Sequence, residues 1–338
     1  MYKLLQKLLF LLPPETAHHF TLSSLSALNK LGILNKIKPK SKDEAIEVMG
    51  IKFPNRIGLA AGLDKNGEYI QSLSNLGFGF IEIGTVTPLS QLGNPVPRLF
   101  RLPKANAIIN RMGFNNKGVD YLTNQVADAR QAGFEGIVGI NIGKNFDTAV
   151  EDATEDYLKG LRAAYDYADY ITINISSPNT PGLRTLQYGE ELDKLLSAIK
   201  AEQLKLQASH NKYVAIAVKV APDLDADEIK GIAGSLLENK IDCLIATNTT
   251  LSRDAVVGMK HGDETGGLSG EPVREMSTEV IKQFHAVLKD QIPIIGVGGI
   301  ASAQDAQDKL DAGAVLVQVY SGLIYEGPML VKTLVKNL

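Results

Sequence analysis

Residues 294–322 read IIGVGGIASAQDAQDKLDAGAVLVQVYSG and contain one complete unit of a pattern that recurs along the chain. A short apolar run at 294–297 is followed by a glycine-rich turn, a segment with helical spacing at 303–310 and a second apolar run at 315–319. Runs that are apolar throughout are typical of strands buried on both faces of a parallel sheet. The segment therefore predicts a strand–helix–strand unit with parallel strands.

The same alternation extends back to Arg56. Eight apolar runs can be counted, at 57–61, 80–84, 137–141, 170–174, 214–218, 243–247, 294–297 and 315–319. Helical patterns lie between several of them, at 152–168, 190–208, 225–238, 278–289 and 303–310. Eight strands with intervening helices match a closed (β/α)8 TIM barrel better than a doubly wound sheet, so the expected fold class is α/β.

Loop lengths indicate which end of this barrel is functional. The loops after the second, fourth and sixth runs are long, at 85–116, 176–188 and 248–272, whereas helix-to-strand connections such as 311–313 are short. Long loops in a compact domain usually carry function. These three leave the carboxyl ends of strands, where barrel enzymes place their chemistry, so the sequence favours an enzyme over a scaffold.

Polar residues end most of the runs and predict a ring around the barrel mouth. They are Asp64, Lys65, Thr85, Asn141, Asn174, Lys219, Thr247, Asn248, Tyr320 and Ser321. Amides donate and accept while lysines only donate, so the ring suits a planar, carbonyl-rich, anionic ligand. Asparagine and threonine also cap helices after strands, which leaves that role open for any one of them. The glycine-rich turn at 296–300 and the segment 320–322 follow the last two runs, where barrels bind phosphate.

Composition excludes several other classes of protein. The chain has 338 residues, 44% hydrophobic and 22% charged, as in a soluble globular protein. A formal net charge of −3 argues against nucleic acid as a partner. The single Cys243 permits no internal disulfide and reads as a small buried hydrophobe, and the five histidines show no metal-ligand spacing, so no metal site is expected. No G-x-S-x-G context supports a hydrolase triad.

The first 40 residues differ from the rest in charge. Six lysines stand there against one acid, Glu15, which leaves −8 for the remainder of the chain. Leucines recur at helical spacing from Leu4 to Leu12, and a second amphipathic stretch runs from Phe20 to Leu31 after a break at Pro13-Pro14. Two such helices fit an element that lies on a membrane surface, and they fit equally well a helical pair packed on the main domain.

Motifs that run in order through the chain resemble those of the dihydroorotate dehydrogenase family. In the barrel they are 60–65, 83–88, 110–116, 141–145, 174–186, 246–250 and 266–270, and in the extension the string is 15–20. The resemblance is to the quinone-dependent, membrane-associated class 2, which has an N-terminal helical extension and places serine at the catalytic-base position, where the soluble class usually has cysteine. Ser177 stands at that position.

The resemblance implies three groups of binding residues besides the catalytic Ser177. An FMN cofactor would be bound by Ala61, Gly62, Leu63, Asp64, Lys65, Thr85, Asn141, Asn174, Lys219, Thr247, Gly270, Gly299, Tyr320 and Ser321. The substrate would be bound by Lys65, Asn110, Arg111, Met112, Gly113, Phe114, Asn174, Asn179, Asn248 and Thr249. A quinone would contact His18, Arg101 and Tyr320, with His19 as the alternative histidine.

The implied function is oxidation of dihydroorotate to orotate in pyrimidine (UMP) biosynthesis. Ser177 would take a proton, hydride would pass to FMN, Lys219 would stabilise the negative charge of the reduced flavin, and a membrane quinone would reoxidise it. The expected organisation is a membrane- and quinone-binding extension over residues 1–40 and a catalytic barrel over 41–338. The expected form is a peripheral, monomeric protein on the cytoplasmic side of the cell membrane.

Two other functions stay open from the sequence. A different FMN barrel, such as a dihydrouridine synthase acting on RNA, would share the phosphate loops but should bring a basic surface, which the barrel portion lacks. A non-catalytic, membrane-peripheral protein that binds a phosphate ligand would need neither Ser177 nor Lys219. Turnover with dihydroorotate and a quinone distinguishes both from the main hypothesis.

Overall fold

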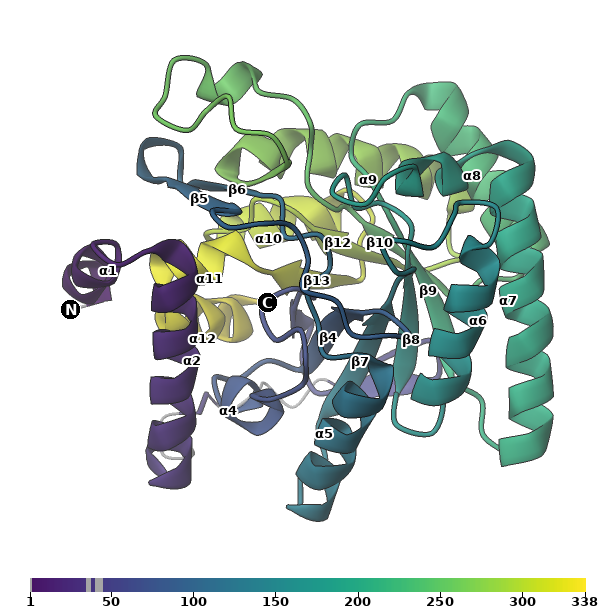
Figure 1. Ribbon diagram of the computed structural model, residues 1–338, viewed down its shortest axis with the longest axis horizontal. Helices are drawn as coiled ribbons and strands as arrows, with labels where there is room; N and C mark the ends of the chain where they lie inside the picture. Colours follow the sequence, from purple (N-terminus) through teal and green to yellow (C-terminus); the bar gives the residue numbers. More distant parts are fainter. Residues whose placement is uncertain (1, 35–37, 40–44) are drawn as a thin grey trace.

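A closed barrel of eight parallel strands forms the centre of the molecule (Figure 1). The computed structural model describes residues 2–34, 38–39 and 45–338. In barrel order the strands are β3 (Ile57–Leu59), β4 (Phe80–Val86), β7 (Ile137–Ile142), β8 (Tyr170–Asn174), β9 (Ala215–Val220), β10 (Cys243–Ala246), β12 (Ile294–Val297) and β13 (Leu316–Val319). Each predicted run coincides with one of these strands, so the predicted (β/α)8 barrel is confirmed.

Helices cover the outside of the barrel. They are α4 (Ile70–Ser74), α5 (Val119–Gln131), α6 (Ala153–Ala164), α7 (Gly189–His210), α8 (Ala226–Glu238), α9 (Arg274–Leu288), α10 (Ala303–Asp311), α11 (Ser321–Glu326) and α12 (Pro328–Asn337). The five predicted helical segments correspond to α6 through α10. The start of α8 shows how the local sequence ends a loop and begins a helix. The Asp225 side chain accepts from two backbone N–H groups, and the Glu228 side chain accepts from the backbone N–H of Asp225.

The barrel interior is apolar at its amino-terminal end. Phe80 and Tyr170, at the first positions of β4 and β8, pack there in a cluster with Phe53. Phe53 belongs to a hairpin of β1 (Ile46–Val48) and β2 (Ile51–Phe53), and its ring meets that of Phe80 edge to face at 5.1 Å. The hairpin, which the sequence pattern did not indicate, therefore closes this end of the barrel.

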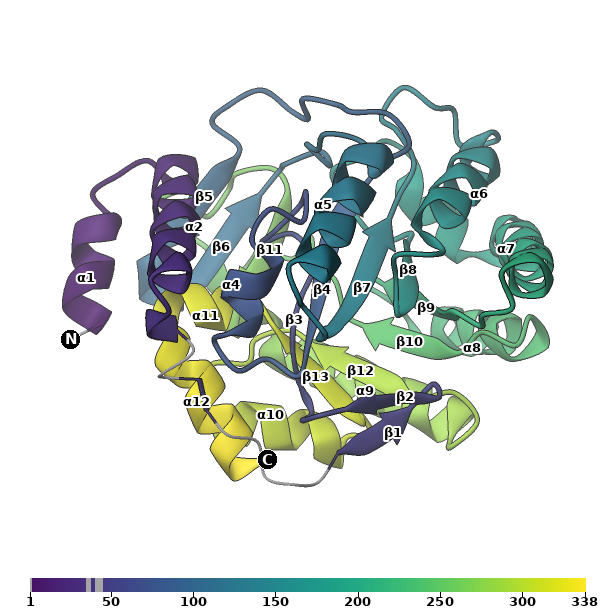
Figure 2. The same cartoon turned by 90° about the horizontal axis from the view of Figure 1, so that it is seen from below.

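Two of the long loops build a second sheet at the other end. Strands β5 (Leu99–Leu102) and β6 (Ala107–Asn110) come from the loop after β4, and β11 (Gly267–Gly270) comes from the loop after β10. They pair antiparallel in the order β11-β6-β5. Figure 2 shows this sheet lying between the barrel and the N-terminal helices.

The N-terminal segment forms two helices, α1 (Tyr2–Leu9) and α2 (Pro14–Lys30), with the break at Pro13-Pro14 as predicted. The Tyr2 hydroxyl donates to the Ile324 carbonyl at 2.7 Å, and Arg98 pairs with Glu15 at 3.0 Å. The helices are thus packed on the barrel through one side. No helix within the described ranges is long and apolar enough to cross a membrane. The predicted domain boundary at residues 40 and 41 falls outside the described residues.

Candidate active site

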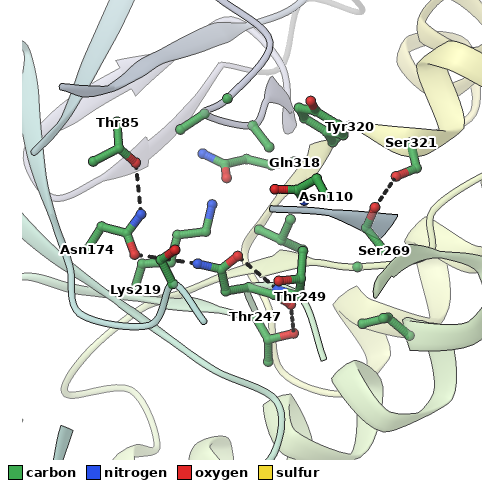
Figure 3. Close-up of a pocket in the computed structure, with 18 of the residues that line it drawn as sticks. Thr85, Asn110, Asn174, Lys219, Thr247, Thr249, Ser269, Gln318, Tyr320 and Ser321 are labelled. Carbon is green, nitrogen blue, oxygen red and sulfur yellow. Dashed lines mark hydrogen bonds between the residues drawn. The ribbon is translucent and has the colours of Figure 1, made fainter. Parts of the chain in front are cut away.

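A cleft of about 1040 Å³, counting its open mouth, lies at the carboxyl ends of the barrel strands. Its lining comes from the strand ends, from β6 and β11 of the small sheet, and from the loop after β8. Figure 3 shows the labelled side chains converging on this space from several elements.

Most site residues predicted from the sequence line the cleft. They are Ala61, Gly62, Lys65, Thr85, Asn110, Met112, Gly113, Phe114, Asn174, Ser177, Asn179, Lys219, Thr247, Asn248, Thr249, Gly270, Gly299, Tyr320 and Ser321. The structure thus brings together residues that lie more than 250 positions apart in the chain.

Arg111, which the sequence predicted to bind substrate, is not among the residues that line the cleft. Its guanidinium pairs with Glu264 at 2.7 Å, donates to the Pro97 carbonyl at 3.0 Å and lies 4.5 Å from the ring centre of Phe100. The physical reason is alternation along an extended chain, because its neighbours on both sides face the cleft and it must point the other way.

Five further predicted residues are not among those that line the cleft: Leu63, Asp64, Asn141, His18 and Arg101. The Asp64 carboxylate accepts from the backbone N–H groups of Glu68 and Tyr69 and so shapes the turn that carries Lys65. The Arg101 guanidinium donates to the carbonyls of Leu9 and Leu12. The Arg101 side chain therefore links β5 to the turn between α1 and α2 and does not line the cleft.

A network of amides and hydroxyls fixes the wall of the cleft. Asn174 donates to Thr85 Oγ1 at 2.9 Å and to Asn141 Oδ1 at 3.2 Å, and Thr85 donates to the same Asn141 oxygen at 2.5 Å. Across the mouth, Asn179 donates to the carbonyl and the side-chain oxygen of Asn110. These bonds fix the orientations of the amides. A site that recognises a ring with several carbonyl and N–H groups needs amides whose orientations are fixed in this way.

Two lysines bring positive charge to the cleft. Burial lowers the pKa of Lys219 against the opposing effect of the Glu82 charge, and burial lowers the pKa of Lys65 to about 8. Neither ammonium forms a hydrogen bond or an ion pair with any residue in the described part of the chain. Two such donors without partners suit an anionic ligand.

Helix α2 brings His18 close to Lys65. Burial, the Lys65 charge and then His19 lower the pKa of His18 to about 3, so its imidazole is neutral at physiological pH. His19 is exposed. Of the two histidines that the sequence left as alternatives, His18 is therefore the one beside the cleft.

Ser177 lies in the loop after β8 and is 6% exposed. Its Oγ accepts a hydrogen bond from the backbone N–H of Asn179 at 3.2 Å, and Pro178 restrains the backbone between them. The hydroxyl of Thr180, three residues further on, is buried and has no partner among the described residues. Ser177 is thus held in one place, and the same loop carries a second hydroxyl, that of Thr180, which can still form a hydrogen bond.

The turn after β12 shows why two glycines stand there. Gly298 and Gly299 have φ values of 128° and 73°, which only glycine adopts readily. A Cβ on Gly299 would lie 2.4 Å from the Cβ of Arg274 at the start of α9. The backbone of this turn therefore packs closely against α9 and is not covered by side chains of its own. Phosphate binding through backbone N–H groups requires such an uncovered backbone.

Sequence reasoning missed several lining residues, of which Gln318 and Ser269 are polar. Ser269 Oγ lies 2.9 Å from Ser321 Oγ, and the amide of Gln318 points into the cleft (Figure 3). Gln318 carried a usable signal, since it is the one polar residue in the run 315–319. Ser269 carried none, because its position depends on the pairing of β11 with β6.

The fold and the cleft define a (β/α)8 barrel protein with a polar cleft at the carboxyl ends of its strands. A family model described as dihydroorotate dehydrogenase matches residues 44–338. The chain belongs to this family.

Relatives and solved structures agree with this assignment. The "Dihydroorotate dehydrogenase (quinone)" of Marinobacter nauticus is 55% identical over 336 residues, covering 99% of this chain and 98% of the relative. The protein of the same name from Cellvibrio japonicus is 57% identical over 331 residues, covering 98% and 96%. The crystal structure of the Eimeria tenella enzyme in complex with ferulenol superposes with a TM-score of 0.87 at 37% identity, covering 96% of this chain and 90% of that one.

Proposed function

We propose that the protein is a quinone-dependent dihydroorotate dehydrogenase that oxidises dihydroorotate to orotate in pyrimidine biosynthesis and uses FMN bound in the cleft. The bound flavin would supply the redox chemistry, accepting a hydride equivalent from the substrate and passing two electrons to a quinone. The observation that carries the proposal is the cleft itself, which combines a fixed Ser177, two unpaired lysines and an oriented set of amides in a chain of this family.

The residues present fit FMN. Lys219 offers a donor without a partner, and Gln318 Oε1 is a buried acceptor without one in the described part of the chain. A flavin ring edge, with alternating carbonyl and N–H groups, would satisfy both. The Gly298-Gly299 turn and the backbone of Tyr320-Ser321 supply N–H groups for the phosphate, where barrels usually bind one. Ala61, Gly62, Thr85, Asn174, Thr247 and Gly270 complete this proposed site.

The opposite side of the cleft suits the substrate. Asn110, Asn179 and Asn248 can bond ring carbonyl and N–H groups, and Lys65 can pair with a carboxylate. The remaining proposed contacts are Met112, Gly113, Phe114, Asn174 and Thr249, all of which line the cleft.

Ser177 is the proposed catalytic base, and its hydroxyl needs an onward acceptor for the proton. The unpaired Thr180 hydroxyl is the acceptor that the loop provides. Because the Thr180 hydroxyl has no hydrogen-bond partner among the described residues, a water molecule between the two hydroxyls would have to carry the proton from Ser177 onward.

The N-terminal extension is proposed to bind the membrane and the quinone. Its outward residues include Leu4, Leu8, Leu11, Phe20 and Leu31, which are 69%, 58%, 81%, 58% and 72% exposed. Leucine faces with lysines beside them are typical of helices that lie in the membrane interface. His18, Arg101 and Tyr320 remain the proposed quinone contacts, the extension is residues 1–40 and the catalytic domain 41–338, and the protein would act as a monomer on the cytoplasmic face of the membrane.

Flavin spectroscopy tests the proposal directly. Purified protein should be yellow, and dihydroorotate added without air should bleach the flavin band, whereas orotate should shift the band without bleaching it. Adding a long-chain quinone in vesicles should restore the oxidised spectrum. A protein that stays colourless after reconstitution with FMN would overturn the proposal.

A further inference from the structure

Two loops from different strands form part of the cleft wall. The loop after β8 carries the proposed base Ser177, and the loop after β10 carries the proposed substrate contacts Asn248 and Thr249. A base removes a proton only from a group within hydrogen-bond reach, so the two loops must keep a fixed distance from each other. The contacts that hold them together therefore matter for the reaction.

One side chain bonds to both loops. The guanidinium of Arg184, in the short 3-10 helix Leu183–Gln187, donates from Nε to the Ser176 carbonyl at 3.1 Å and from Nη2 to the Thr249 carbonyl at 2.9 Å. Ser176 directly precedes Ser177 in the chain. Arg184 is not among the residues that line the cleft, so its effect on a bound ligand has to pass through these two carbonyls.

An aspartate after β9 completes the arrangement. Arg184 Nη1 pairs with Asp223 Oδ2 at 2.8 Å, and Asp223 Oδ1 accepts from the Thr250 hydroxyl and from the Leu251 backbone N–H. The side chains of Arg184 and Asp223 are 18% and 25% exposed, and an ion pair within such a hydrogen-bonded network holds its geometry better than an isolated surface pair. The planar guanidinium bonds two carbonyls and a carboxylate at once, which the single ammonium of lysine does less well.

The two loops differ in how firmly they are attached elsewhere. The loop after β10 is joined to β11 by backbone bonds in both directions between Thr250 and Leu268, at 3.0 and 2.8 Å. Residues 176–179 form no backbone-to-backbone hydrogen bond with another element in the described part of the chain. Their bonds to other elements involve side chains, and one of these is the bond from Arg184 to the Ser176 carbonyl. Loss of Arg184 should therefore displace the serine loop more than the loop after β10.

We propose that Arg184 is a positioning residue that holds the Ser177 loop against the substrate-binding loop, so that the base lies within reach of the proton it removes. Arg184 acts only through the backbone of Ser176 and Thr249. A displacement of about 1 Å at a reacting atom can cost on the order of 10² in rate, so a residue outside the cleft can have a large effect. The inference rests on the function proposed above, since it concerns the proton that Ser177 takes from dihydroorotate.

Removal of the guanidinium in the FMN-loaded protein tests the proposal. In anaerobic stopped-flow experiments at saturating dihydroorotate, we expect Arg184→Ala to lower the limiting rate of flavin reduction by about 10-fold to 100-fold. The dissociation constant for orotate, measured from the shift of the flavin band, should rise by a smaller factor, because the loop after β10 keeps its backbone bonds to β11. A variant that is only destabilised would not separate the two measurements.

Arg130 provides a matched control at the opposite end of the barrel. Its guanidinium also bonds two carbonyls, those of Phe134 and Gly136, and pairs with an aspartate, Asp169, at 2.8 Å. Gly136 and Asp169 directly precede β7 and β8, at the amino ends of these strands. Arg130→Ala should therefore lower the thermal midpoint, as Arg184→Ala should, and leave the limiting rate of flavin reduction at its wild-type value.

Chemical rescue distinguishes lost contacts from lost stability. Ethylguanidinium at millimolar concentration should restore part of the lost rate in Arg184→Ala and leave the wild-type rate unchanged. Arg184→Lys keeps a positive charge beside Asp223 but lacks the planar group, so it should remain slower than the wild type. If Arg184→Ala does not bind FMN, the comparison of limiting rate with orotate affinity in Arg184→Lys decides by the same criterion.

Three results would overturn the inference: a wild-type limiting rate in Arg184→Ala, equal losses of rate and of orotate affinity, or a lowered rate that does not recover with ethylguanidinium. A wild-type protein whose flavin is not reduced by dihydroorotate would instead overturn the proposed function. The two failures are distinguishable, because the first requires an active wild type and the second is seen in the wild type alone.

Discussion

The proposed base, Ser177, has no hydrogen bond to a histidine in the described part of the chain. Its Oγ accepts from the Asn179 backbone, and the Thr180 hydroxyl of the same loop has no partner among the described residues. A serine base must pass its proton onward, and this transfer is favoured at higher pH. The rate of substrate oxidation should therefore increase as pH rises.

We expect Ser177→Ala to retain FMN and bind orotate while the rate of flavin reduction falls by about 10² or more, the usual size of a general-base contribution. Ser177→Cys should keep partial activity because a thiol ionises more readily but is larger. Stopped-flow bleaching of the flavin measures both. Reduction of Ser177→Ala at near wild-type speed would remove the serine from the mechanism.

Lys65 provides a pH-dependent prediction for binding. Its pKa in the ligand-free protein is lowered to about 8, so the side chain is charged below that pH and neutral above it. Orotate affinity should therefore be constant at low pH and weaken up to tenfold per pH unit above about 8. Titration of the flavin spectrum with orotate measures this, and Lys65→Met should bind weakly with no such dependence. A wild-type affinity that is flat to pH 10 would contradict the assignment.

Individual residues show how far the sequence could predict the site. Strand ends converge in any parallel barrel, so Thr85, Asn174, Lys219 and Thr247 could be placed without coordinates. The direction of Arg111 could not, because it depends on the register of β6 with its neighbours. Glu82 had a signal, a lone charge in a strand buried on both faces, yet its partners lie on three other strands.

Among the elements, strands with continuous apolar sequence were predictable, and short strands that include polar residues were not. The eight barrel strands are marked by continuous apolar sequence, which burial on both faces requires. The hairpin β1–β2 and the sheet β5-β6-β11 have strands of three or four residues inside segments that look like loops. Their pairing is set by contacts with distant parts of the chain.

The extension gives a prediction at the level of helices α1 and α2. Changing Leu4, Leu8 and Leu11 together to serine removes apolar surface that is mostly exposed in the protein. The affinity for lipid vesicles should therefore weaken, by a factor of ten for about every 1.4 kcal/mol of binding free energy that the leucines contribute. Flavin reduction by dihydroorotate should be unchanged. Sedimentation with vesicles measures the first and stopped-flow the second, and undiminished sedimentation would show that this face does not meet the membrane.

For the whole molecule, the closed amino end of the barrel should make a measurable contribution to stability. Phe53 is fully buried against Phe80, and Phe53→Ala should lower the free energy of unfolding by about 3–5 kcal/mol. FMN affinity should change little, because the cleft lies at the opposite end. Denaturant unfolding of the cofactor-free protein measures the loss, with the half-exposed Ile51→Ala of the same hairpin as a control expected to cost less. A loss under 1 kcal/mol in Phe53→Ala would show that the hairpin is only loosely attached.

That closed end also bears on the order of catalytic events. With the hairpin occupying one end of the barrel, the proposed electron donor and electron acceptor would both reach the proposed cofactor site from the end that carries the cleft. The two half-reactions then share a single reduced enzyme and need not occur in a ternary complex. In steady-state kinetics this is a substituted-enzyme cycle, for which double-reciprocal plots at several fixed quinone concentrations give parallel lines.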